Sequence, residues 1–152
     1  GALDDPVETD AKDIVSDVVT KARRGGLQVE SGTVAEGVSG LMRPLAISRA
    51  LENLVSNAAR HAGRVRVSLT ASPRALVFSV EDDGPGIPEE QRDEAMRAFT
   101  QLDAARNQNR GAGVGLGLAI VSTVASQHGG DLRFQRADAG LSARLQLCRF
   151  WS

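Results

Sequence analysis

Glycines alternate with apolar residues in the run GAGVGLGLAIV, from Gly111 to Val121, and this run limits the folds open to the chain more than any other stretch. Gly113, Gly115 and Gly117 lie at the start of an apolar segment whose pattern predicts a helix from Leu116 to Gln127. Backbone N–H groups at such a junction, together with a helix N-terminus, can face phosphate groups. The run is not a P-loop, because no Lys–Ser/Thr pair follows the glycines, and its third glycine is out of register for the dinucleotide-binding motif. A flexible loop with tight helix packing explains these glycines equally well.

The composition of the 152-residue chain fits one globular domain and excludes several classes of protein. Apolar residues make up 41% and aromatic residues only 3%, so we expect a core of Leu, Val and Ala. With 18 basic and 19 acidic residues the net charge is −1, which argues against a protein that binds nucleic acid by neutralising phosphates. The single cysteine, Cys148, excludes an internal disulfide framework and a cysteine-cluster metal site.

The sequence predicts neither a leader nor a membrane span. The N-terminal residues are acidic and lack a basic start followed by an apolar run. The stretch from Gly111 to Gly130 carries no formal charge, but glycine and polar residues interrupt it too often for a spanning helix. We therefore expect the chain as given to be soluble.

Hydrophobic periodicity predicts a mixture of helices and strands without internal repeats. The segment before Asp10 reads as a polar lead-in, and the alternation that begins at Leu27 is expected to give way to a loop over residues 31–40. We expect a two-layer α/β sandwich of the α+β class, in which helices cover one face of a mixed, mostly antiparallel sheet. The expected helices span residues 10–24, 44–62, 89–99 and 116–127, and the expected strands span 65–69, 76–80, 132–134 and 141–147.

Two amides and a guanidinium share one side of the predicted 44–62 helix. At about 100° per residue, Asn53, Asn57 and Arg60 fall within about 60° of one another, and the apolar stripe is centred roughly 120° away. An Asn side chain can offer an oxygen to Mg²⁺ and an amide N–H to a phosphate, while a guanidinium neutralises phosphate charge. On this segment alone, the solvated face of an amphipathic helix is the simpler interpretation. Glu52 lies about 100° from Asn53, so we expect it to point elsewhere and not to act as a catalytic base.

The segment VEDDGPGIP, from Val80 to Pro88, runs from a strand directly into a loop of glycine and proline. Asp82 ends the predicted strand, and Gly84 and Gly86 allow the backbone to come close to a ligand. A carboxylate there can accept a hydrogen bond from the 6-amino group of adenine, whereas the guanine carbonyl would face it with a second acceptor. An ordinary acidic turn is the alternative.

Taken in this order, the three segments closely resemble the ATP-binding catalytic domain of bacterial two-component sensor histidine kinases. These kinases belong to the GHKL superfamily, which shares the Bergerat fold. The superfamily also includes type II topoisomerases, heat-shock-90 chaperones and mismatch-repair ATPases. LENLVSNAARHA is similar to the N box, VEDDGPGIP to the G1 box and GVGLGLAIV to the G2 box. FTQLDAAR, at 99–106, resembles the weaker F box and lid entry, and HGGDLRF, at 128–134, the usual close of the family. The resemblance covers nearly the whole chain from about Leu45 onward.

The resemblance implies that the chain binds ATP and Mg²⁺. Asn57 would ligate the Mg²⁺ ion that bridges the ATP phosphates, and Asn53 and Arg60 would contact phosphate. Arg106 would reach a phosphate when a lid closes over the nucleotide.

The resemblance also assigns residues to the adenine pocket and the lid. Asp82 would accept from the adenine amine, Gly84 and Gly86 would shape the pocket around it, and His61 would stack on the base. The hinge and base of a mobile lid would consist of Gly113, Gly115, Leu116 and Gly117.

Two departures from the superfamily refine this picture. The hydrolytic branches carry a water-activating Glu four residues before the metal-binding Asn, but Asn53 occupies that position here and cannot take a proton. Transfer to a partner nucleophile is therefore favoured over hydrolysis. Neither His61 nor His128 resembles a phospho-acceptor, and His128 reads as a capping or surface residue. We expect residues 1–152 to be one catalytic domain, with the acceptor histidine on a separate dimerisation domain of the same protein.

The same resemblance predicts the setting and leaves rivals open. The parent protein would lie in the bacterial inner membrane and would pass phosphate to a response regulator. This domain would lie in the cytoplasm and would contact neither membrane nor nucleic acid. The alternatives are a stand-alone serine kinase that acts on an anti-sigma antagonist and a nucleotide-sensing interaction module without transfer activity. A hydrolytic ATPase is disfavoured by Asn53.

Overall fold

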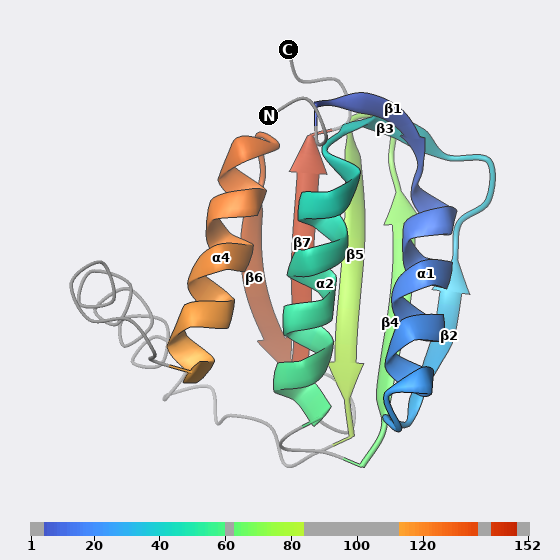
Figure 1. Cartoon of the computed structure of the whole chain (residues 1–152). Helices are drawn as coiled ribbons and strands as arrows, with labels where there is room; N and C mark the ends of the chain where they lie inside the picture. The colour runs from blue at the N-terminus through green and yellow to red at the C-terminus, as the bar shows by residue number, and fades with distance from the viewer. Residues whose placement is uncertain (1–4, 60–62, 84–112, 137–140, 149–152) are drawn as a thin grey trace.

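The fold is a five-stranded sheet with helices packed on one face, as seen in Figure 1. The computed structural model describes residues 5–59, 63–83, 113–136 and 141–148. Within them the elements, in chain order, are β1 Val7–Asp10, α1 Ala11–Arg24, β2 Val29–Val34, β3 Ser39–Met42, α2 Pro44–Ala59, β4 Val65–Ala71, β5 Ala75–Asp82, α4 Gly113–Gln127, β6 Asp131–Arg136 and β7 Leu141–Cys148.

The sheet is mixed, with one parallel pair among those described. Its strand order is β2-β4-β5-β7-β6; β2 runs parallel to β4, and the other neighbours are antiparallel. Because α2 lies between β2 and β4 in sequence, it crosses the sheet face to connect two parallel strands. The expected α+β sandwich is confirmed.

The expectation of a polar lead-in and a loop over residues 31–40 was wrong. β1 pairs with β3 as a separate two-stranded sheet, and β2 continues to Val34. β2 escapes a sequence pattern because it is an edge strand whose residues are mostly exposed and whose pairing shifts register between Ser31 and Val34. Pairing with β4 therefore decides the conformation of this polar segment, since its own hydrophobic pattern does not.

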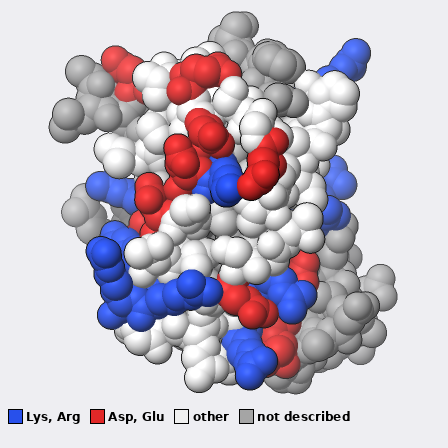
Figure 2. All heavy atoms as spheres, turned by 90° about the vertical axis from the view of Figure 1, so that its right-hand side faces the viewer, with Lys and Arg blue, Asp and Glu red and all other residues white. Residues whose placement is uncertain are grey.

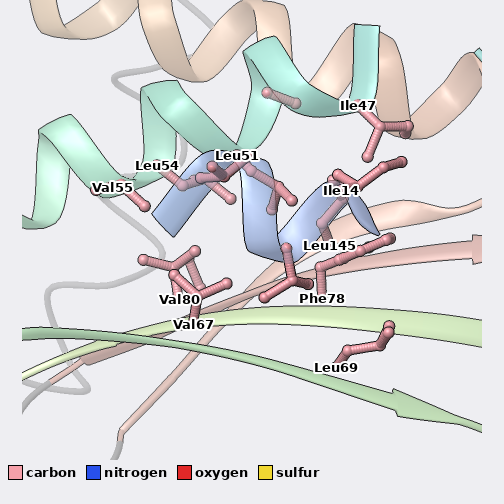
Figure 3. Close-up of a cluster of buried hydrophobic side chains, with 14 of the residues drawn as sticks. Ile14, Ile47, Leu51, Leu54, Val55, Val67, Leu69, Phe78, Val80 and Leu145 are labelled. Atoms are coloured by element: carbon pink, nitrogen blue, oxygen red, sulfur yellow. The ribbon is translucent and has the colours of Figure 1, made fainter. Parts of the chain in front are cut away.

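The core lies between the helices α1, α2 and α4 and the covered face of the sheet. Figure 3 shows side chains of α2 meeting those of the central strands. Ile47, Leu51 and Leu54 are at most 2% exposed, as are Phe78 and Leu145 opposite them. Phe78 and Leu145 are themselves paired across β5 and β7, so one row of the sheet presents a continuous apolar surface to the helix.

His128 joins the end of α4 to the start of α2. Of the two expectations for His128, a capping or a surface residue, the second was wrong, because the side chain is fully buried, and the first is confirmed by its contact with the last turn of α4. Nδ1 lies 2.7 Å from the carbonyl oxygen of Val124, and Nε2 lies 3.0 Å from the backbone nitrogen of Arg43. Since the Arg43 N–H must donate to Nε2, the ring is neutral with its proton on Nδ1. Gly129 follows with φ 71°, a left-handed conformation that ends the helix.

No helix among the residues that the structure describes is long and apolar enough to cross a membrane.

Candidate functional site

Three elements that carry predicted site residues end at the same edge of the molecule. α2 and β5 run toward this edge and α4 begins there, at the bottom of Figure 1. The edge therefore brings together Asn57, near the C-terminus of α2, Asp82, the last residue of β5, and Gly113, the first residue of α4. Segments separated by tens of residues in the sequence thus have their ends on one edge, and a shared site of the N-box, G1-box and G2-box residues stays a prediction.

The buried apolar stripe of α2 fixes how the helix packs, and an ion pair with α1 shows which way Glu52 points. Glu52 accepts from Lys21 Nζ at 3.1 Å, so its side of the helix faces α1. At about 100° per residue, Asn57 lies about 140° around the helix from Glu52. Since α1 and α4 flank α2 on opposite sides in Figure 1, Asn57 lies on the side of α2 turned away from α1. The prediction that Glu52 points away from the asparagines is confirmed.

Asn57 carries an unsatisfied polar atom. Its Oδ1 is buried and finds no hydrogen-bond donor among the described residues. Asn53 and Asn57 are both half-buried, whereas Leu45, Arg49 and Ser56 line the solvent face of the helix. A buried acceptor without a donor costs roughly 1–3 kcal/mol. The side of α2 that carries Asn53 and Asn57 is therefore not an ordinary solvated face at Asn57. An amide oxygen is also a kind of ligand that Mg²⁺ binds.

α4 begins three residues earlier than the sequence predicts. Its helical backbone starts at Gly113, so Gly113 and Gly115 belong to the first turn and not to a preceding loop. Glycine is a poor helix former, which is why propensity places the start at Leu116. The first four N–H groups of a helix lack partners within it and concentrate positive potential. In α4 these groups lie at the edge shared with Asn57 and Asp82.

Asp82 and Asp83 end β5 with different surroundings. Asp82 is half-buried and pairs with Val65 of β4, which places it at the last rung of the ladder. Asp83 is exposed, and its Oδ1 accepts from the backbone N–H groups of Gly63 at 3.1 Å and Arg64 at 3.0 Å. No local sequence pattern indicates a role for Asp83, because its partners lie about 20 residues away.

Several predicted positions fall outside the described residues, as does the expected 89–99 helix. They are Arg60, His61, Gly84, Gly86 and Arg106. Gly117 lies in α4 with Leu116, where the structure describes the backbone but no side chain. In the part of the chain that is described, no group of three His, Cys, Asp or Glu residues could hold a metal ion. Asn57, which the resemblance predicts as a metal ligand, lies among the described residues.

Basic residues gather at the end of α1 that borders this edge. The first turn of the helix holds both Lys12 and Asp13, whereas Lys21, Arg23 and Arg24 lie in its last turn. In Figure 2 acidic side chains crowd the upper half of the face that carries α1, and a band of basic side chains crosses its lower half. Arg23 also donates from Nε to the carbonyl oxygen of Val29 at 2.7 Å, and so fastens the basic end of α1 to the start of β2.

The comparisons with known proteins decide the family. A family model described as histidine kinase-, DNA gyrase B- and HSP90-like ATPase matches residues 42–149. The chain belongs to this ATPase family. The match spans α2, β5 and α4, which are the elements that meet at the edge.

Relatives and solved structures agree with this assignment. Sensor histidine kinase GtrS of Pseudomonas aeruginosa is 40% identical over 119 residues, which are 78% of this chain but 24% of GtrS. The chain thus spans about a quarter of the length of this relative. The ATP-binding domain of PrrB from Mycobacterium tuberculosis is 25% identical with a TM-score of 0.77, covering 97% of this chain and 100% of that one. The histidine kinase domain of the Escherichia coli osmosensor EnvZ is 32% identical with a TM-score of 0.72, covering 95% and 89%.

Proposed function

We propose that the chain is the catalytic domain of a two-component sensor histidine kinase, which binds Mg·ATP and donates the γ-phosphoryl group to a histidine on a separate dimerisation domain. The observation that carries the proposal is the meeting of Asn57, Asp82 and the start of α4 at one edge of an ATPase-family fold. The similarity to sensor histidine kinases selects this branch of the family.

Each residue has a task in holding the nucleotide. Asp82 accepts from the adenine amine, and the N-terminal N–H groups of α4 face the phosphates. Asn57 holds Mg²⁺ through its otherwise unsatisfied Oδ1, and Asn53 and Arg60 contact phosphate. The ion, when bound, supplies positive charge to the phosphate oxygens. His61, Gly84, Gly86 and Arg106 complete the site, with Gly113, Gly115, Leu116 and Gly117 at the base of the lid.

Transfer to a histidine is favoured over hydrolysis because this part of α2 offers no general base to activate water. Asn53 stands where a hydrolytic relative needs a carboxylate, and Glu52 is turned toward Lys21. Water near the γ-phosphate therefore has no general base in this part of α2. The chain holds and orients ATP, and the imidazole of the acceptor domain supplies the nucleophile. A response regulator then takes the phosphoryl group, and the parent protein lies in the bacterial inner membrane.

Phosphotransfer in trans tests the proposal. The purified chain is incubated with γ-labelled ATP and Mg²⁺, with and without the acceptor-histidine domain of the same protein. We expect label on that histidine only when both domains are present. Label on a serine of an anti-sigma antagonist would favour the stand-alone serine kinase, and ATP binding without any transfer would favour a nucleotide-sensing module.

A further inference from the structure

Asp83 ties the end of β5 to the residues that precede β4. Its Oδ1 accepts from the N–H groups of Gly63 and Arg64, and its own N–H donates to the carbonyl oxygen of Arg64 at 3.3 Å. Two successive backbone N–H groups that converge on one oxygen form a nest for negative charge. We call these three hydrogen bonds the Asp83 clip.

The clip closes the β4–β5 ladder at the residue that is expected to read adenine. The last pair of that ladder joins Val65 to Asp82, and the clip lies one residue beyond it. Burial decreases toward this end of β5: Val80 is buried, Asp82 is half-buried and Asp83 is exposed. Packing alone therefore holds the strand end weakly. Strand ends open locally at low free-energy cost unless contacts outside the ladder tie them down.

We propose that Asp83 is a positioning residue for the nucleotide, which holds Asp82 in its adenine-binding place by accepting from Gly63 and Arg64 and does not contact the ligand. The proposal rests on the proposed function. If ATP binds only to molecules in which the Asp83 clip is formed, the apparent affinity is the intrinsic affinity multiplied by the fraction of such molecules. Loss of two ordinary hydrogen bonds is enough to lower it about tenfold.

The test compares variants of neighbouring aspartates in the full chain. Binding of a non-hydrolysable ATP analogue and of the matching GTP analogue is measured with Mg²⁺ for the wild type, Asp83→Ala, Asp83→Asn and Asp82→Asn. Asn at 83 keeps an acceptor oxygen, so it should stay within about threefold of the wild type, whereas Asp83→Ala should bind about tenfold more weakly. Both variants should keep the preference for ATP over GTP, because closed molecules still read adenine through Asp82. Asp82→Asn should reduce that preference.

Amide hydrogen exchange gives a second measurement. In Asp83→Ala the N–H groups of Gly63 and Arg64 should exchange faster, while the N–H of Phe78 in the core of β5 should be unchanged. Loss of protection at Phe78 as well would indicate general destabilisation and would overturn a positioning role.

Three binding results would also overturn the inference. They are wild-type affinity in Asp83→Ala, a changed ATP-to-GTP preference in that variant, and an Asp83→Asn variant as weak as Asp83→Ala. A wild-type chain that binds no ATP would refute the proposed function instead, and the exchange rates at Gly63 and Arg64 would still show whether the clip exists.

Discussion

At the scale of single residues, Asn57 lowers the stability of the free chain through a polar atom that a bound ligand would satisfy. Its Oδ1 is buried without a donor among the described residues, a position that a fold selected for stability alone would fill with an apolar side chain. The neighbouring Ser56 is exposed and carries no such cost. The contrast within one turn of α2 marks Asn57 as the residue that a cation or a ligand donor completes.

Replacing Asn57 with Ala should therefore separate binding from folding. We expect Asn57→Ala to lose at least about tenfold in Mg²⁺-dependent ATP affinity, because the metal loses its amide ligand. Its free energy of unfolding should stay within about 1 kcal/mol of the wild type or rise, since a buried unsatisfied acceptor is removed. Calorimetric titration and denaturant unfolding measure the two quantities.

The control is Ser56→Ala, on the solvent face of the same turn, which should change neither quantity. Unchanged Mg²⁺-dependent affinity in Asn57→Ala would contradict the role assigned to its amide.

At the scale of elements, sequence pattern predicts those parts whose own periodicity decides their structure. α1, α2 and the strands from β4 onward carry clear apolar stripes or alternation, and the predictions for them agree with the structure wherever it describes them. β2 was missed because its pairing partner β4 decides its conformation, and the early start of α4 because glycine propensity argues against a helix. The meeting of Asn57 with Asp82 followed from a resemblance, whereas the Asp83 clip and the burial of His128 depend on contacts between distant segments that no local pattern reports.

The turn after α4 gives a prediction at this scale. A Cβ at Gly130 would collide with the backbone carbonyl of Gln146 on β7, so neither partner can yield by rotating a side chain. We expect Gly130→Ala to lower the free energy of unfolding by about 2–3 kcal/mol, as overpacking against backbone does. Chemical denaturation followed by circular dichroism gives the value.

Gly25→Ala is the matched control, because its Cβ would meet Ala22 only at ordinary contact distance and its φ is −80°. The control should remain within about 0.5 kcal/mol of the wild type. Equal stability of the two variants would show that β7 moves to accept a methyl group.

At the scale of the whole molecule, the domain is arranged lengthwise. His128 joins α4 to α2 at one end of the domain, and the candidate site lies at the other end. At the same end as His128, Asp10 caps the start of α1 by accepting from the N–H of Lys12 at 3.0 Å.

The lone chain should bind without modifying itself. With γ-labelled ATP and Mg²⁺ we expect stoichiometric nucleotide binding but no stable protein-bound label and no steady release of phosphate, because Asn53 is not a base and His128 is buried. Gel autoradiography and a phosphate-release assay detect the two products. Stable label on the lone chain would refute the requirement for a separate acceptor.

The charge distribution predicts how ATP approaches. Association with a fluorescent ATP analogue, measured by stopped flow, should slow about threefold or more between low and physiological ionic strength. Reversing Arg24 to Glu should reduce the low-salt association rate and leave dissociation unchanged, since this exposed residue does not belong to the candidate site. An association rate independent of salt would contradict this expectation.

The gathering of basic residues at one end of α1 therefore makes the near-zero net charge a poor description of this molecule. If the chain binds ATP as proposed, the basic last turn of α1 attracts the phosphates toward the end of the domain that carries the candidate site before any contact forms. A domain that is almost neutral in total can in this way collect a strongly charged substrate from the right direction.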